Sequence, residues 1–213
     1  MNKKTYNKGF SLVELIIVIA IMAILSAAIA PALIRYINKA RKADDIATAD
    51  SIGTTLNAAI QSDDDMYDYI SDCSGHNNLS STWRDGRDYR VIAYMNVPNK
   101  NAHLPVKQMH LCPIAKYDFD GDLVEFTDKF NEYIGAELVY PKFTTSPHLD
   151  QWMLATDKDR NLYVFIGGGV SDSRCWISKD GDVFNNNGFK AYMLWPEVSS
   201  DYKKLNTPND ANP

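Results

Sequence analysis

The longest apolar pattern in the chain runs from Phe10 to Ile34. These 25 residues contain one charged side chain, Glu14. About 20 apolar residues are enough to cross a bilayer as a helix. The pattern therefore predicts a membrane-spanning helix near the N-terminus.

Beyond Arg35, apolar residues recur at steps of mostly three and four, which is the period of one helical face. They are Ile37, Ile46, Ala49, Ile52, Leu56, Ala59 and Ile60. We therefore expect one helix from about Ser11 to Gln61, with its second half lying on a globular domain. Pro31 lacks a backbone donor, so we expect a kink or a local opening of the helix there.

The rest of the chain mixes short helices with strands. Helical patterns cover Met66 to Ser71 and Phe126 to Ile134, whereas Tyr89 to Met95 and Met109 to Ala115 pattern as strands, the second at a sheet edge. From Leu149 to Trp195, strand patterns alternate with acidic turns, which predicts an antiparallel meander. The expected fold class is α+β, a long N-terminal helix packed on an antiparallel β-sheet with irregular loops and short helices.

Charge is distributed unevenly along the chain. Lys3, Lys4 and Lys8 precede Phe10 without an acid among them, and the remainder has 19 basic against 27 acidic residues. The positive-inside rule keeps the Lys-containing end in the cytoplasm and sends the part beyond the span outward. The acidic outer part argues against nucleic-acid binding through neutralisation of phosphates.

Glu14 is the residue that a membrane span alone does not explain. A charge at membrane depth is costly, so such a residue is expected to have a function and a partner. A cleaved secretory signal ending at Ala28-Ile29-Ala30 is one alternative, and an uncleaved signal anchor is another. Neither alternative gives Glu14 a role.

The order of these features resembles a known signal. Gly9-Phe10-x-x-x-Glu14 after a short basic leader, followed by a long apolar helix that contains Pro31, is similar to the class III signal of type IV pilins and pseudopilins. The resemblance covers residues 1 to about 45. It implies that a prepilin peptidase cuts between Gly9 and Phe10 on the cytoplasmic side and methylates the new Phe10 amine.

The resemblance also implies a life cycle and a domain plan. Subunits would wait in the cytoplasmic membrane and then join a helical filament at the cell surface, with an assembly ATPase and a platform protein as partners. The chain would comprise a leader (1–9), a membrane and assembly half of the helix (10–34), a pilin-like globular domain that includes the rest of the helix (35–205), and a polar tail (206–213) predicted to be disordered.

The family places its assembly contacts at the start of the helix, which here means Phe10, Glu14 and Pro31. If Glu14 pairs with the Phe10 amine of a neighbouring subunit, an incoming subunit is stabilised only at the axial stagger that brings the two charges together. Unpaired buried charge is unfavourable, so wrong registers are rejected.

Three cysteines, Cys73, Cys112 and Cys175, lie far apart in the sequence. With His76, or with His110 as the alternative fourth ligand, they supply enough donors for one structural zinc site. One disulfide with a free thiol is the second alternative, and three unlinked cysteines are the third. No cofactor is required, and a zinc ion would hold loops together.

The remaining motifs carry little chemistry. Asp118, Asp120 and Asp122 have the spacing of a calcium loop, but a D-G hairpin turn is the simpler interpretation. No nucleophile elbow, paired-acid or HExxH motif occurs, so we expect no enzymatic activity.

The expected function is a structural subunit of a type IV pilus for adhesion, motility or aggregation. A pseudopilin of a type II-like secretion system, a DNA-uptake pilin and a signal-anchored adhesion or receptor domain are the alternatives. A calcium ligand set would favour the pseudopilin. The large globular domain favours a minor subunit of the pilus. The Lys-containing leader and the small number of cysteines in the chain suit a Gram-positive host.

Overall fold

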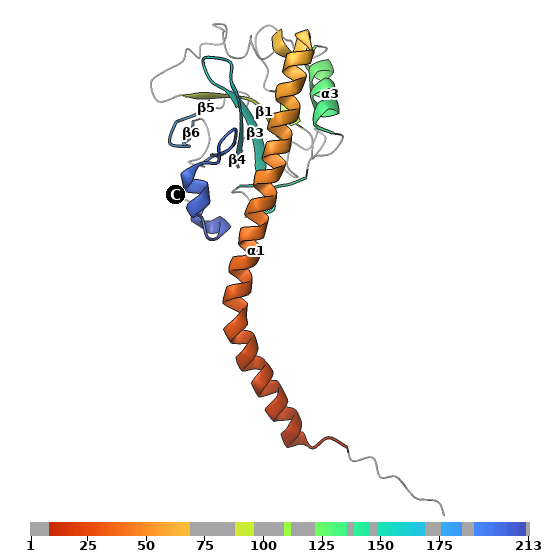
Figure 1. The fold of residues 1–213 in the computed structure, drawn as a ribbon, viewed down its shortest axis with the longest axis vertical. Helices are drawn as coiled ribbons and strands as arrows, with labels where there is room; N and C mark the ends of the chain where they lie inside the picture. The colour runs from red at the N-terminus through yellow and green to blue at the C-terminus, as the bar shows by residue number, and fades with distance from the viewer. Residues whose placement is uncertain are drawn as a thin grey trace, which may run out of the picture.

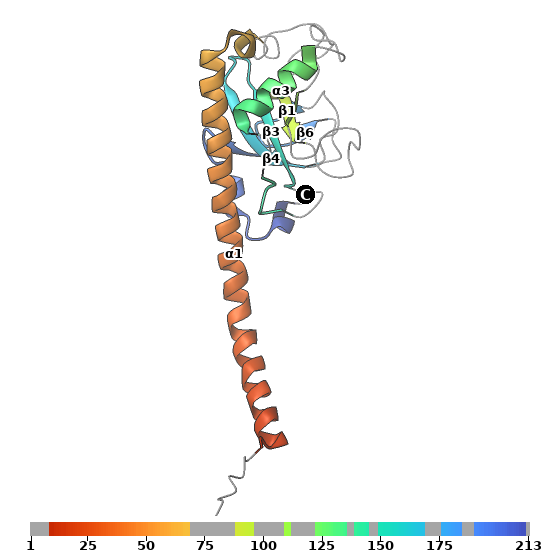
Figure 2. The same ribbon diagram turned by 90° about the vertical axis from the view of Figure 1, so that its right-hand side faces the viewer.

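A long helix, α1 (Leu12–Ser62), runs through the whole molecule and carries a head on its second half (Figure 1). The structure is a computed structural model that describes residues 9–68, 88–95, 109–111, 122–135, 139–144, 149–168, 176–184 and 190–211. The predicted single helix is confirmed to within one residue at each end. It passes Pro31 without ending, and both views show a gently curved rod (Figure 2).

The head is built on a seven-stranded antiparallel sheet with the order β6-β5-β1-β3-β4-β7, and β2 pairs with β1 beside this path. The strands are β1 (Tyr89–Met95), β2 (Met109–Leu111), β3 (Gln151–Thr156), β4 (Leu162–Gly167), β5 (Trp176–Ile177), β6 (Val183–Phe184) and β7 (Tyr192–Trp195). The α+β class is as expected.

The predicted meander is wrong in its pairing. β3 and β4 form a hairpin, and so do β5 and β6, but β4 pairs with β7 and β5 pairs with β1. Alternating residues indicate that a segment is a strand. They do not indicate which edge of the sheet it joins once the connection is longer than a tight turn.

The sheet curls until its two ends meet. Asp182, just before β6, forms a β-bridge with Lys190, just before β7. The backbone N–H of Ala191 also donates to the carbonyl of Gly181 at 2.8 Å. These contacts close one end of the sheet, so it encloses an apolar interior of its own.

Both faces of the sheet are therefore buried. In β3, Trp152 and Leu154 pack in the layer that also contains Ile52 of α1, whereas Met153 and Ala155 belong to the layer inside the curl. Every residue of β3 is buried. This two-sided burial explains why the strand reads as a nearly continuous apolar run.

Close packing joins α1 to β7. Gly53 lies against the indole ring of Trp195, and a Cβ atom on Gly53 would overlap that ring. Gly53 is therefore a site of close approach between helix and sheet.

Polar side chains on the side of α1 that faces the head hold the C-terminal part of the chain. Asn38 Nδ2 donates to the carbonyl of Asn206 at 3.0 Å, and Lys42 Nζ donates to the carbonyls of Lys203 and Leu205 at 2.9 Å each. These bonds fix α4 (Ser200–Lys204) beside the helix, where the blue segment lies in Figure 1.

Asp45 completes this junction from a buried position. Its carboxylate accepts the backbone N–H groups of Lys142 and Phe143 at 2.7 and 2.9 Å, and the hydroxyl of Tyr202 at 3.3 Å. Burial raises the pKa of Asp45 above its usual range, although the three donors oppose that shift. The carboxylate thus joins the helix to two separate segments of the head.

The predicted disorder of the tail is wrong for its described part. Residues Pro208–Ala211 form a 3-10 helix, and Ala211 is 3% exposed. Asp210 stabilises this turn because its carboxylate accepts the N–H groups of Asn206 and Thr207 at 2.8 and 2.9 Å. A polar composition did not reveal that one small apolar residue would be buried against the core.

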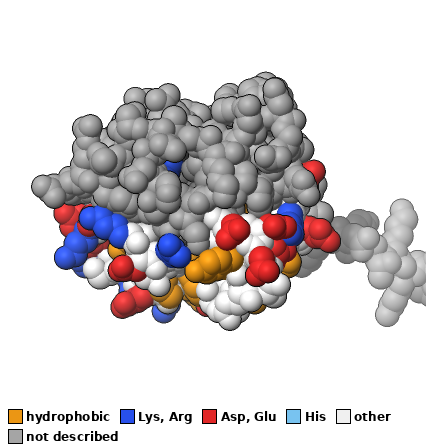
Figure 3. All heavy atoms as spheres, turned by 90° about the horizontal axis from the view of Figure 1, so that it is seen from above, with side chains coloured by type: hydrophobic (Ala, Val, Ile, Leu, Met, Phe, Trp, Pro, Cys, Tyr) orange, Lys and Arg blue, Asp and Glu red, His pale blue; other side chains and the backbone are white. Residues whose placement is uncertain are grey.

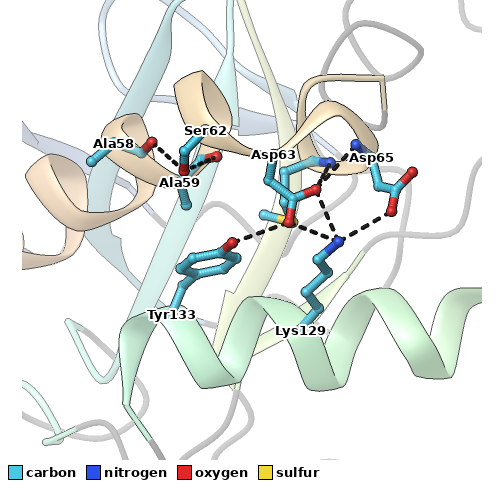
Figure 4. Close-up of polar contacts among 8 residues, drawn as sticks. Ala58, Ala59, Ser62, Asp63, Asp65, Lys129 and Tyr133 are labelled. Carbon is cyan, nitrogen blue, oxygen red and sulfur yellow. Dashed lines mark hydrogen bonds and ion pairs between the residues drawn. The ribbon is translucent and has the colours of Figure 1, made fainter.

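At the far end of the head, α3 (Asp122–Ile134) is bonded to the end of α1 (Figure 4). Lys129 Nζ donates to Asp63 Oδ1 at 2.9 Å and to Asp65 Oδ2 at 3.1 Å, and the Tyr133 hydroxyl donates to Asp63 Oδ2 at 3.0 Å. The ammonium group of Lys129 lowers the pKa of Asp63.

The predicted D-G hairpin is wrong from Asp122 onward, because residues 122–125 belong to α3. Acidic residues in the first turn of a helix interact favourably with its dipole, and the sequence places Asp122 and Glu125 there. Gly135, at φ 102°, follows the last helical residue as expected. Residues 64–68 are also helical, two residues earlier than predicted, because Asp63 caps the N–H of Met66 at 3.2 Å.

Candidate assembly site

The start of α1 is fixed by two reciprocal hydrogen bonds. Ser11 has extended backbone angles, and its Oγ accepts the N–H of Glu14 at 3.2 Å. In return, Glu14 Oε2 accepts the N–H of Ser11 at 2.8 Å. Together they form a capping box, which satisfies two backbone donors that the first helical turn leaves free.

This role of Ser11 was missed in the sequence, although the signal was present. Ser11-x-x-Glu14 before an apolar run is the pattern of a capping box. The helix therefore begins directly after the Gly9–Phe10 bond, and that bond lies in non-helical chain.

The first half of α1 has no cover from the rest of the chain. Its most apolar 18-residue window has a mean hydropathy of 2.9 and is 0% buried, and it is the one helix among the described residues that is long and apolar enough to cross a membrane. Phe10 is 85% exposed and Ile24 is 70% exposed. A helix that is apolar on all sides needs lipid or other helices around it.

Glu14 is the one charged side chain on this half of the helix. Among the described residues it forms no ion pair, and its carboxylate bonds to the Ser11 N–H of its own chain. Phe10 N is the backbone nitrogen immediately before Ser11 N. An amine created at Phe10 would therefore lie next to a carboxylate that is already in place.

Pro31 lies within α1 and is exposed. The missing backbone donor at this position does not end the helix, so residues on either side remain on one continuous rod. Glu14 and Pro31 thus share a single helix that begins just after Phe10, and 17 residues separate them, or about 26 Å at 1.5 Å per residue.

The predicted metal site falls mainly outside the described residues. This holds for Cys73, His76, Cys112 and Cys175, while His110 lies in β2 opposite Tyr94. Within the described part of the chain, no group of three or more His, Cys, Asp or Glu side chains could hold a metal ion. The calcium candidates Asp118 and Asp120 also lie outside that part.

The structure adds a hollow that the sequence did not indicate. A cavity of about 370 Å³ lies at the closed end of the curled sheet, where Phe165 and Tyr89 meet Lys179, Lys190 and Glu197. Its lining carries both signs of charge together with aromatic rings. This mixture does not select one class of ligand.

Comparison with protein families gives one match, to the prokaryotic N-terminal methylation motif, over residues 4–30. The matched segment contains Gly9, Phe10 and Glu14 and ends directly before Pro31. No curated protein and no solved structure matches the chain. None of these comparisons therefore assigns the head a family or a function.

Proposed function

We propose that this chain, whose residues 4–30 match the prokaryotic N-terminal methylation motif, is a structural subunit of a type IV pilus. The subunit is held in the cytoplasmic membrane by the first half of α1 and is then assembled into an extracellular filament. A prepilin peptidase cuts between Gly9 and Phe10 and methylates Phe10. The head acts in adhesion, motility or aggregation and has no enzymatic role.

The observation that carries this proposal is the contrast between the two halves of one helix. The second half is joined to the head by buried residues such as Asp45 and Leu56, whereas the first half is exposed on all sides. A single carboxylate, Glu14, stands near its free end. Lateral packing of such helices buries their apolar surface and makes the position of that carboxylate decisive.

The capping box refines the proposed register mechanism. After cleavage, Glu14 can neutralise the Phe10 amine of its own chain, since Ser11 N already lies 2.8 Å from the carboxylate. In the filament, the amine of a neighbouring subunit competes for the same carboxylate. The register is then set by the difference between these two pairings, which is favourable only at one axial stagger.

Glu14→Gln separates the charge from the cap. The glutamine oxygen can still accept the Ser11 N–H, so the start of the helix is kept while the negative charge is lost. We expect normal membrane insertion but at least about a tenfold loss from the sheared filament fraction, which corresponds to about 1.4 kcal/mol. Glu14→Ala and Glu14→Val, which remove both the charge and the carboxylate half of the capping box, should lose at least as much.

Ser11→Ala is the matched control. It removes the hydroxyl half of the capping box, which is worth about 1 kcal/mol to a helix, but keeps the carboxylate. We expect it to assemble nearly as well as the unmodified chain. Normal incorporation of Glu14→Gln would refute the register role, and loss of both variants to the same extent would assign the defect to capping.

A pseudopilin is the second candidate, because the methylation motif is common to both classes. Its short filament stays within the secretion machinery, so the unmodified chain would be absent from sheared surface filaments and its deletion would impair secretion. A signal-anchored surface domain is the third candidate, and it would keep an uncut N-terminus.

A further inference from the structure

Three exposed cations surround α1 where its apolar run ends. Arg35 directly follows Ile34, and Lys39 and Arg41 come within the next two turns. All three side chains are exposed, and none of them forms an ion pair within the described part of the chain. Lys42, the fourth cation of this stretch, is instead bonded to carbonyls of the head.

Acids on the next turns of α1 and in the C-terminal part of the chain already have partners, and Asp210 accepts the N–H groups of Asn206 and Thr207. Asp44 pairs with Lys142 at 3.0 Å, and Asp201 pairs with Lys204 at 2.8 Å. Asp45 is buried and accepts three hydrogen bonds. Between Glu14 and Asp44 the sequence contains no acid. This end of the head therefore carries an uncompensated positive charge.

The charge balance reverses in the sequence beyond this stretch. From Asp44 to the end, the chain has 15 basic against 26 acidic residues. Figure 3, which views the molecule from the opposite end, shows Asp and Glu side chains among Lys and Arg side chains on the described part of the head. The stretch of α1 between Glu14 and Asp44 is thus basic, whereas the remainder of the chain is acidic.

The spacing of the cations matches the headgroup layer of a bilayer. Six residues separate Arg35 from Arg41, or about 9 Å along a helix, and the polar layer on each side of the hydrocarbon core is roughly 5–8 Å thick. Long basic side chains reach across such differences in depth. Tyr36, which is 71% exposed, adds an aromatic ring of the kind enriched at this depth.

The cations lie on two sides of the helix, because Arg35 and Lys39 are about 40° apart around its axis. At about 100° per residue, Arg41 lies roughly 160° around the axis from Lys39. One neighbouring protein contacts one side of a helix, whereas lipid headgroups surround a single subunit on all sides. The arrangement therefore favours lipid as the partner.

We propose that Arg35, Lys39 and Arg41 form a headgroup collar that binds the phosphates of anionic lipids in the outer leaflet of the cytoplasmic membrane. This inference rests on the proposed storage of the subunit in that membrane. The collar holds the acidic head at a fixed height above an anionic surface that would otherwise repel it. Extraction into the filament then breaks these lipid contacts.

The test measures lipid selectivity in vesicles that contain the full chain. Phosphatidylcholine vesicles receive spin-labelled phosphatidylglycerol or spin-labelled phosphatidylcholine, and the protein-bound fraction of each is measured by electron paramagnetic resonance. The unmodified chain is compared with Arg35→Gln/Lys39→Gln/Arg41→Gln. Both carry the same leader, so Lys3, Lys4 and Lys8 contribute equally to the two.

We expect the unmodified chain to select phosphatidylglycerol, and the collar variant to lose up to about fivefold of that selectivity for each cation removed, because a juxtamembrane cation contributes about a fivefold factor. The preference should weaken as salt is added. A control variant, Lys158→Gln/Arg160→Gln/Lys179→Gln, removes the same charge from turns of the head and should keep the selectivity.

Equal selectivity in the unmodified chain and the collar variant would overturn the proposal. It would also be overturned if the collar variant kept its lipid selectivity but failed to enter filaments, since the cations would then belong to a contact between copies. Failure of the pilus proposal is read separately, from processing and filament incorporation of the unmodified chain, because lipid selectivity requires neither.

Discussion

Glu14 and Asp45 are two carboxylates on one helix with opposite surroundings. Asp45 is 1% exposed and all its hydrogen-bond donors come from its own chain. Glu14 is exposed and bonds to one backbone N–H. Burial with partners makes the first a structural residue, whereas the second keeps its charge available to another molecule.

Asp45→Ala should strongly destabilise the head. The substitution leaves the N–H groups of Lys142 and Phe143 without their acceptor in a buried position, and each such loss costs about 1–3 kcal/mol. We expect the free energy of unfolding to fall by about 2–4 kcal/mol. Urea unfolding of the full chain in detergent, followed by tryptophan fluorescence, measures it.

Asp44→Ala is the matched control for this prediction, because its carboxylate is half exposed and pairs with a Lys142 side chain that is also half exposed. A surface pair of this kind contributes at most about 1 kcal/mol. Equal effects of the two variants would show that Asp45 does not hold the junction.

The elements of the fold were predictable where one pattern decided them. The 3.6-residue period over Ile46, Leu56 and their neighbours predicted the second half of α1, and the β-branched and aromatic run at Tyr89 to Met95 predicted β1. The short strand β6 has two residues and no pattern of its own. β5 and β7 cover part of their predicted ranges. Ser178 begins the turn to β6, Lys190 and Ala191 bond to Asp182 and Gly181, and the other flanking residues lie outside the described part of the chain.

Gly53→Ala tests the contact between α1 and β7. Alanine favours a helix over glycine by about 1 kcal/mol, but here its Cβ would overlap the Trp195 ring. Overpacking costs about 1–3 kcal/mol, so we expect a net loss of up to about 2 kcal/mol in the free energy of unfolding.

The control for Gly53→Ala is Asn57→Ala, an exposed position on the same helix, which should be neutral or slightly stabilising. The double variant Gly53→Ala/Trp195→Leu should lose less stability than the two single losses added together, because the smaller side chain makes room. Strict additivity would count against a direct contact.

Lys129→Gln tests the contact between α1 and α3 through its pH dependence. Lys129 lowers the pKa of Asp63 below 3.8, so the folded state binds its proton less readily than the unfolded state. This contribution is fully present above the ordinary pKa of Asp and is lost as the pH falls through the lowered value. The unmodified chain should therefore be more stable than Lys129→Gln at pH 7, and the two should converge near pH 2.

Urea midpoints of both proteins at pH 7, 5 and 2 measure this difference. Comparing two variants removes the opposite contribution of Asp45, whose raised pKa favours the folded state at low pH in both. A difference that stays constant down to pH 2 would show that the Asp63 charge is not its source.

At the scale of the whole molecule, the chain consists of a bare apolar rod and a head that covers the other end of the same rod. The N-terminal half was readable from the sequence, because the membrane, the cleavage site and Glu14 are all encoded within about 30 consecutive residues. The head was not, because its strand order and its closure depend on contacts such as Asp182 with Lys190 and β4 with β7 that no local pattern specifies.

The same division applies to the candidate site. Gly9, Phe10 and Glu14 were predicted from the resemblance of their pattern to a pilin signal, and the structure adds Ser11, which forms two hydrogen bonds with Glu14. The cysteine site depends on how residues far apart in sequence come together, so spacing did not decide between zinc, a disulfide and free thiols. Metal analysis of the purified chain separates zinc from the other two.

The N-terminus of the mature protein tests the central claim most directly. The chain is purified from cells that contain a prepilin peptidase and analysed by mass spectrometry of its N-terminal peptide. The account predicts a protein that begins at Phe10 with a methylated amine. A mature chain that begins at Met1 or at Pro31 would contradict it, because Glu14 would then lack the amine that the assembly mechanism requires.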